Sequence, residues 1–362
     1  MSDLGDVRSK IDQIDQALQA LISERAVLAQ QVGIAKRNAN DNAEYFRADR
    51  EAQVLRQVIA RNADGPLSDD EMVRLFREIM SACLAQQEPL KIAFLGPAGT
   101  FTQTAALKQF GHSIRDLPLA SIDEVFQEVE SGSADFGVVP IENSTEGTVN
   151  HTLDMFLLSP LKICGEVQLR IEQHLLGSDH NTLESAQRIC AHQQSLAQCR
   201  GWLREHLPSV ELIGVSSNAE GARRARDEAG TLAIAGQSAA DVFGLDLLVS
   251  NIEDRSDNTT RFLVLGKSLL PATGEDKTAL MMSAPQSGGA GALYKLLLPF
   301  STHGVNMTRI ESRPSRKGVW DYVFFVDLDG HPDDENIKTA LAELDDADTL
   351  CRVIGAYPRA VL

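Results

Sequence analysis

The sequence lacks the features that mark membrane, secreted and nucleic-acid-binding proteins. No stretch approaches the ~18 consecutive apolar residues of a membrane-spanning helix, and the opening MSDLGDVRSK has no apolar segment typical of a secretory signal. Positive charge is also scarce, because 34 Lys and Arg are outnumbered by 51 Asp and Glu, a formal net charge of −17 that would repel a phosphate backbone. We therefore expect a cytoplasmic protein that binds neither membranes nor nucleic acids.

Paired cysteines are absent as well. The five cysteines are odd in number, widely spaced and form no CxxC pair, whereas disulfide frameworks and zinc sites need thiols at defined spacings. We expect reduced thiols, as in cytosolic proteins, and no metal site built on cysteines.

The first part of the chain, residues 1–89, has a purely helical pattern. Apolar residues recur at three- and four-residue steps and predict one long helix over about 7–36. Shorter helices are predicted over 49–61 and 68–87, the second of which starts at a capping box on Ser68. This segment is therefore expected to form an all-α domain.

The pattern changes at Lys91, where short apolar strands begin to alternate with helical stretches. Such alternation predicts an α/β domain with largely parallel strands over residues 90–268. A linker-like stretch at 269–277 follows. The order of elements over 277–362 is βαββαβ, which predicts an α+β domain of the ferredoxin-like type.

Three basic residues stand out on the first predicted helix of this acidic chain. Arg25 and Lys36 are 11 residues apart, so they share a helix face ~16 Å apart and could converge on one small dianion. They could equally be solvated surface charges. Arg8 lies 28 residues before Lys36, ~42 Å along a straight helix. Arg8 can therefore join the same site only from an antiparallel partner chain.

An LRxKIDxID-type opening, ISERAVLAQQVGIAK and ADREAQVL resemble the all-helical chorismate mutases over residues 5–87. The resemblance implies rearrangement of chorismate to prephenate, a pericyclic reaction that needs neither a nucleophile nor a cofactor. Catalysis would come from holding the reactive conformer and placing cationic donors at the ether oxygen. The implied site residues are the partner subunit's Arg8 and, within one chain, Arg25, Lys36, Arg50, Glu51, Cys83 and Gln87.

The same resemblance implies roles for these residues. The arginines would hold the carboxylates, Lys36 and Gln87 would donate to the ether oxygen, and Glu51 would accept a hydrogen bond from the hydroxyl. Cys83 stands where some relatives have Ser, and Arg47 stands where some have an acidic residue. Both departures affect how the substrate is contacted, and they leave open a domain that has lost its mutase activity.

The α/β segment contains several candidate site motifs. GPAGTFT, residues 96–102, follows a strand and opens a helix, so its N–H groups could bind an anion or simply form a tight turn. Glu142, Asn143 and Ser144 follow a buried strand at its carboxyl end, where α/β folds place ligands. Isolated His192 has an ordinary structural interpretation, as has the capping box at Ser217.

Together, GPAGTFT, PIENSTEG, HQQSLAQC and NTTRFLVLG resemble the prephenate dehydratases from about Lys91 to Lys267. The resemblance implies two α/β lobes like a type II periplasmic binding protein, with the site in the cleft. Thr260 would assist loss of the ring hydroxyl as water, and Arg261 would bind a carboxylate. The implied pocket residues are Glu142, Asn143, Ser144 and Gln198. Ala191 replaces a Ser found in many members, so no role is expected for it.

SGGAGALYKLL, residues 287–297, could be mistaken for a dinucleotide loop, but the βαββαβ order is wrong for that fold. With ESRP at 311–314 the segment instead resembles an ACT regulatory domain. The resemblance implies a phenylalanine effector site, whereas the residues alone also allow a domain that only aids folding. The implied effector residues are Gly291, Ala292, Leu293, Glu311, Ser312, Arg313 and Pro314.

The three resemblances together imply a bifunctional enzyme. It would convert chorismate to prephenate and then to phenylpyruvate, be inhibited by L-phenylalanine, and form a homodimer or a larger homo-oligomer. Two alternatives stay open. One is a dehydratase with a degraded mutase domain, and the other is a non-catalytic sensor of small ligands built from the same lobes.

Overall fold

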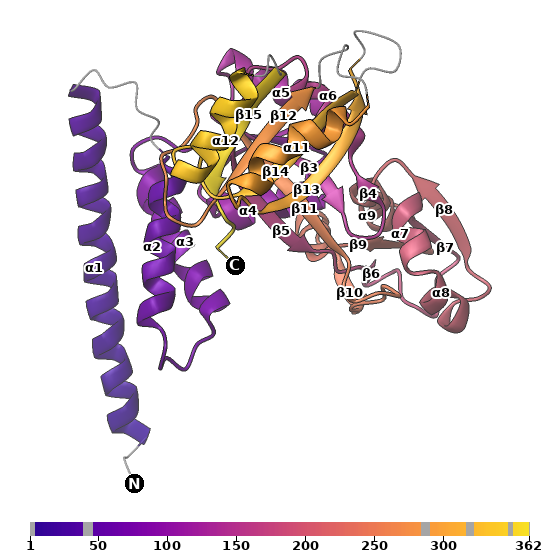
Figure 1. Ribbon diagram of the computed structural model, residues 1–362. Coiled ribbons are helices and arrows are strands. Elements are labelled where there is room, and N and C mark those ends of the chain that lie inside the picture. The colour runs from indigo at the N-terminus through magenta and orange to yellow at the C-terminus, as the bar shows by residue number, and fades with distance from the viewer. Residues whose placement is uncertain (1–3, 39–45, 284–289, 316–321, 347–349, 362) are drawn as a thin grey trace.

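The computed structural model describes residues 4–38, 46–283, 290–315, 322–346 and 350–361. The chain forms a helical segment, two α/β lobes and a C-terminal βαββαβ domain (Figure 1). Within the described ranges, no helix combines the length and the apolar character needed to cross a membrane. The predicted multidomain organisation, with α, α/β and α+β parts, is confirmed.

Three helices form the N-terminal segment: α1 (Leu4–Asn38), α2 (Ala48–Arg61) and α3 (Asp69–Ala85). The predicted capping box is present, because Ser68 accepts from the Glu71 amide while the Glu71 carboxylate accepts from the Ser68 amide. Helix α1 packs chiefly against α3 and lies along the margin of the molecule (Figure 1). Helix α2 packs on α3 and also against the C-terminal domain.

The first lobe is built on a sheet of order β5-β11-β3-β1-β2. Its strands are β1 (Lys91–Leu95), β2 (Arg115–Leu119), β3 (Phe136–Asn143), the short β4 (Gly147–Thr148) paired with β3, β5 (Lys162–Arg170) and β11 (Thr259–Gly266). Its helices are α4 (Phe101–Phe110), α5 (Ile122–Ser131) and α6 (Asn150–Phe156). Strands β1, β3 and β11 are buried along most of their length, as a sheet covered on both faces requires, whereas edge strand β2 is mostly exposed.

The second lobe has a sheet of order β10-β6-β9-β7-β8. Its elements are β6 (His174–Gly177), β7 (Arg188–His192), α7 (Gln193–Gln198), α8 (Arg200–His206), β8 (Glu211–Val215), α9 (Asn218–Asp227), β9 (Thr231–Ala235), α10 (Gln237–Phe243) and β10 (Asp246–Val249). The chain enters this lobe after β5 and returns to the first lobe as β11.

The expectation of largely parallel strands is only partly right. Strand β11 runs antiparallel to both β3 and β5, and β6 runs antiparallel to β9 and β10. The reason is the chain path, because β11 re-enters the first lobe from the second without the helical crossover that a parallel neighbour needs. Both sheets are therefore mixed.

The C-terminal domain has the predicted βαββαβ order: β12 (Asp276–Ser283), α11 (Ala292–Thr302), β13 (Met307–Pro314), β14 (Tyr322–Asp329), α12 (Glu335–Asp346) and β15 (Leu350–Pro358). Strand β15 lies beside β5, which joins this sheet to that of the first lobe. The two strands approach closely at Gly355, where a Cβ atom would lie 2.6 Å from the Cβ of Ile163. A buried core continues across this junction. The C-terminal domain is thus packed directly on the lobe that carries β3 and β11.

Candidate active sites

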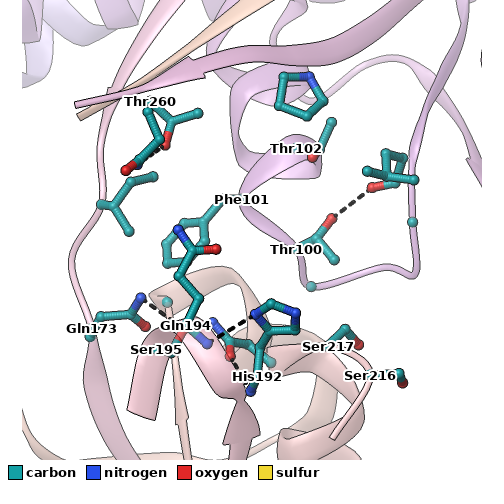
Figure 2. A pocket seen from close by; sticks show the side chains of 18 of the residues that line it. Thr100, Phe101, Thr102, Gln173, His192, Gln194, Ser195, Ser216, Ser217 and Thr260 are labelled. Carbon is teal, nitrogen blue, oxygen red and sulfur yellow. Dashed lines mark hydrogen bonds between the residues drawn. The ribbon is translucent and has the colours of Figure 1, made fainter. Parts of the chain in front are cut away.

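A cleft of about 380 Å³ lies between the two lobes and receives side chains from both. Figure 2 shows Thr260 on one side of this cleft and Gln173, His192 and Ser195 across from it. Polar groups predominate among the side chains shown. The residues that line the cleft include Gly96, Thr100, Asn143, Gln173, His192, Ser195, Gln198, Ser217 and Thr260.

Asn143 and Thr260 form a fixed pair in this cleft. They are register partners at the end of β3 and the start of β11, and both side chains are almost fully buried. The Asn143 amide donates to Thr260 Oγ1 at 2.8 Å and to Asn258 Oδ1 at 2.9 Å. Asn143 Oδ1 accepts from Thr145 and Glu146, which fixes the orientation of the amide. Because Thr260 Oγ1 accepts from Asn143, its own hydroxyl proton remains available to donate.

Arg261 points to the opposite face of β11, because successive side chains of a strand alternate. Its guanidinium donates to Glu166 at 2.8 Å, to Asp327 of β14 at 2.6 Å and to the Tyr357 hydroxyl at 2.9 Å. Burial would lower the pKa of the guanidinium, but Tyr357, Asp327 and Glu166 together raise it. Arg261 does not line the cleft, so the structure does not bring it together with Thr260.

Glu142 also alternates away from the cleft. Its carboxylate accepts from Arg309 of β13 at 3.0 Å. Ser144 clamps the end of β3 to the start of β11, since its hydroxyl accepts from the Thr259 amide at 3.0 Å. Gln198 does line the cleft, and its amide donates across it to Thr145 at 3.4 Å. Of the four pocket residues expected from the sequence, Asn143 and Gln198 therefore reach the cleft.

In the helical segment, Gln87, just after the end of α3, packs against Gly33 of α1. A Cβ atom on Gly33 would lie 2.7 Å from Gln87 Oε1, so the glycine allows this close packing, one turn before Lys36. Cys83 is buried one turn before Gln87. Gln87 Oε1 is buried without a hydrogen-bond partner in the described part of the chain. A buried acceptor in that state normally has a ligand or water to complete it.

Glu51 lies on α2 and forms an ion pair with Arg77 of α3 at 3.2 Å. Burial raises the pKa of the Glu51 carboxyl to about 6, although Arg77 acts to lower it. Arg50, by contrast, is exposed, and its side chain donates to Gln53 at 3.4 Å. Arg77 was not anticipated from the sequence.

Helix α1 is continuous from Leu4 to Asn38, so Arg8 lies far from Lys36 in the same chain. Arg8 is exposed, and Arg25 is partly exposed. The helix also exposes a row of apolar side chains, each at least 40% accessible: Leu4, Val7, Ile11, Ile14, Leu18, Leu21, Ile22, Val27, Leu28, Val32 and Ile34.

Family models match three consecutive segments of the chain. Chorismate mutase type II matches residues 7–88, prephenate dehydratase matches 92–269, and the ACT domain matches 289–346. Over 359 residues the chain is 51% identical to the bifunctional chorismate mutase/prephenate dehydratase of Stutzerimonas stutzeri, with 98% of each chain covered. The chain belongs to the bifunctional chorismate mutase/prephenate dehydratase family.

Two solved structures are similar over the dehydratase and ACT domains. The prephenate dehydratase of Arthrobacter aurescens in complex with L-Phe is 36% identical, with a TM-score of 0.69 over 75% of this chain and 90% of that chain. GqqA, a quorum quenching acylase, is 31% identical, with a TM-score of 0.68 over 75% of this chain and 98% of that chain. The same architecture therefore occurs in proteins described by different activities.

The dehydratase cleft also contains Ser217, for which the sequence favoured a structural role, and Thr100 of the GPAGTFT motif, for which an anion site and a tight turn were both open. Thr100 caps α4 by accepting from the Gln103 amide, and Ser217 caps α9 by accepting from the Glu220 amide at 3.1 Å. Both nevertheless line the cleft. Their position in the sequence could have indicated a site, because each residue starts a helix directly after a strand. A capping role therefore did not exclude a place in the site.

In the ACT domain, the expected effector residues fall on two elements. Gly291 precedes α11 with φ of 82°, a left-handed conformation that favours glycine, and Ala292 and Leu293 begin the helix. Residues 287–289 of this motif lie outside the described ranges. On β13, Ser312 and Pro314 are exposed, while Glu311 and Arg313 turn toward the dehydratase domain.

Proposed function

We propose that this chain converts chorismate to prephenate in the mutase domain and prephenate to phenylpyruvate in the dehydratase cleft. The Asn143–Thr260 pair carries the second assignment, because it presents an oriented hydroxyl donor in a cleft between two lobes. The first test supplies prephenate and follows the ultraviolet signal of phenylpyruvate. The second supplies chorismate. A signal from prephenate alone would mean a degraded mutase, and no signal from either would favour a ligand sensor.

Thr260 would donate its proton toward the ring hydroxyl that leaves as water. The bond to the ring carboxylate breaks and releases carbon dioxide, and its electron pair moves into the ring as the carbon–oxygen bond breaks. One proton is consumed, which Thr260 passes on from solvent. A threonine is a weak acid, so its contribution is a preorganised hydrogen bond that strengthens as the oxygen departs.

Two helices begin at the cleft, and their N-termini would attract the negative charges of the substrate. Helix α4 of the first lobe begins beside Thr100, and α9 of the second begins beside Ser217. Helix N-termini attract anions through their unpaired N–H groups and the helix dipole. Because prephenate carries two carboxylates, we assign one to each helix start. Arg261 is engaged by two carboxylates of the protein and is not needed for this arrangement.

The mutase site would act through fixed donors. Lys36 would stabilise negative charge that develops on the ether oxygen, and the Gln87 amide would turn its N–H₂ to the same atom. The ionised carboxylate of Glu51 would accept a hydrogen bond from the chorismate hydroxyl. Arg25 and Arg50 would hold carboxylates, a role that their partial or full exposure leaves open.

We further propose that the enzyme is a homodimer in which two α1 helices pack antiparallel. The apolar row on α1 is too extensive for a surface left in water. An antiparallel partner would cover it and bring the partner subunit's Arg8 to Lys36. The positions of the charged residues and of the apolar residues on α1 thus both favour an antiparallel second copy. Sedimentation of the intact chain and of an Ile11→Glu, Leu18→Glu variant tests this assembly, since only the variant should be monomeric.

L-phenylalanine is the proposed effector of the ACT domain. Support comes from the Gly291 and ESRP motifs and from the Arthrobacter aurescens relative, whose structure contains L-Phe. Calorimetry with L-phenylalanine, beside the dehydratase assay, tests binding and inhibition together. The proposed location is the cytoplasm, where the unpaired state of all five cysteines is usual.

A further inference from the structure

Strand β13 of the ACT domain contacts the dehydratase domain through Arg309. The Arg309 side chain is 13% exposed, and its Nε donates to Glu142 at 3.0 Å. Its Nη2 donates to Thr148 Oγ1 at 3.3 Å, and that hydroxyl in turn donates to Glu311 at 2.9 Å. Each of these three hydrogen bonds joins β13 to the β3–β4 hairpin. The arrangement is therefore a closed network between the two domains.

The two dehydratase residues in this network face each other across one hairpin. Glu142 of β3 is the register partner of Thr148 of β4, and Asn143 is the partner of Gly147 on the next rung. Arg309 thus holds both strands of the hairpin at once. The residue directly after Glu142 is Asn143, which donates to Thr260. The ACT domain and the catalytic hydroxyl are consequently separated by very few contacts.

We propose that Arg309 is a positioning residue of the dehydratase: by fixing the β3–β4 hairpin, it sets Asn143 against Thr260. This inference rests on the proposed role of Thr260. Arg309 does not line the cleft, so it acts on alignment rather than on substrate binding. Glu311 belongs to the ESRP segment, so the same network gives an effector at that segment a direct route to the catalytic pair.

The test compares Arg309→Met with Arg359→Met in the full-length enzyme, with prephenate as substrate. Arg359 is a matched control, because it pairs with Asp329 at the edge of the ACT domain and touches no part of the cleft. Arg309→Met is expected to lower kcat about tenfold, as misalignment of a reacting group does, and to change KM by less than about twofold. Arg309→Lys should recover part of kcat because it restores one charged donor.

A second measurement follows the effector. L-phenylalanine should bind Arg309→Met by calorimetry but inhibit it less than the control. A kcat and an inhibition equal to those of Arg359→Met would overturn the proposal. If Arg309→Met does not fold, Thr148→Val removes the shared hydroxyl at nearly constant volume, and unchanged kcat would overturn it equally. Thr260→Ala, assayed beside these variants, separates the two failures, since full activity there would refute the assigned site itself.

Discussion

The two catalytic domains differ in how much of each site one chain builds. In the dehydratase cleft both lobes come from the same chain, and the polar atoms of Asn143 all have partners. In the mutase domain, α1 exposes half or more of Ile11 and Leu28, and buried Gln87 Oε1 has no hydrogen-bond partner among the described residues. The exposure of α1 therefore marks the mutase site as the one that we propose a second copy completes. An unpartnered amide oxygen does not mark it, since Gln173 Oε1 of the cleft is also buried with no partner among the described residues.

Thr260→Ala tests the dehydratase side of this comparison and should give the largest effect on activity. We expect dehydratase kcat to fall by about 10²–10³-fold, because an oriented donor at the developing charge is lost. Mutase activity should stay normal, since Thr260 lies in another domain. Steady-state assays with prephenate and with chorismate measure both, and Thr260→Ser should retain part of the rate. A fully active alanine variant would show that another group assists water loss.

Mixing two inactive mutase variants tests the other side. Lys36→Ala and Arg8→Ala should each lose ~3–4 kcal/mol of transition-state stabilisation. In a mixed dimer one site receives both mutations and the other receives neither. Random exchange should therefore restore about a quarter of wild-type mutase activity, because half of the dimers are mixed and each has one intact site.

The control for this experiment is dehydration of prephenate, which should be unchanged in both parents and in the mixture. Subunit exchange is verified with differently tagged chains. Absence of recovery in dimers that have exchanged would contradict a site shared between subunits.

Much of this organisation could be predicted from local patterns. The spacing of Ile11, Leu18 and Leu28 predicts a single amphipathic helix, and the Ser68 capping box predicts where α3 begins. The βαββαβ order follows in the same way. The exposure of the apolar row was not predictable, because periodicity shows that a face is apolar but not what covers it.

The site residues show what local sequence patterns cannot predict. Thr260 and Arg261 are neighbours in one motif, yet the strand sends them to opposite faces. The alternation of side chains along a strand predicts this separation. It cannot show that Arg261 binds Asp327 and Tyr357 on the opposite face of the sheet. Glu142 has its partner, Arg309, 167 residues further along the chain. A motif thus locates a functional region, whereas long-range packing decides which of its side chains face the cleft.

The pH dependence of the mutase gives a smaller effect. The Glu51 carboxyl has its pKa raised by burial to about 6, and the ionised form is needed to accept a hydrogen bond. As pH falls through this value Glu51 gains a proton, so mutase kcat/KM should fall about tenfold per unit below it. Arg77→Met should move this acid limb to higher pH, because Arg77 lowers the pKa. Glu51→Gln, if folded, should lack the limb altogether.

The smallest effect concerns the effector, and it compares two glycines of the ACT domain. Gly291 and Gly304 lie before and after α11, and both have positive φ. A Cβ atom on either would meet no atom of the described residues within 4 Å. Valine should therefore strain the backbone similarly at both positions, but only at Gly291 would it fill space proposed for L-phenylalanine. We expect Gly291→Val to weaken inhibition by about fivefold to tenfold, within the ~1–3 kcal/mol of an ordinary allosteric coupling. Gly304→Val should leave phenylalanine affinity near that of the wild type. Calorimetry on both variants decides the matter, and equal affinities would place the effector away from Gly291.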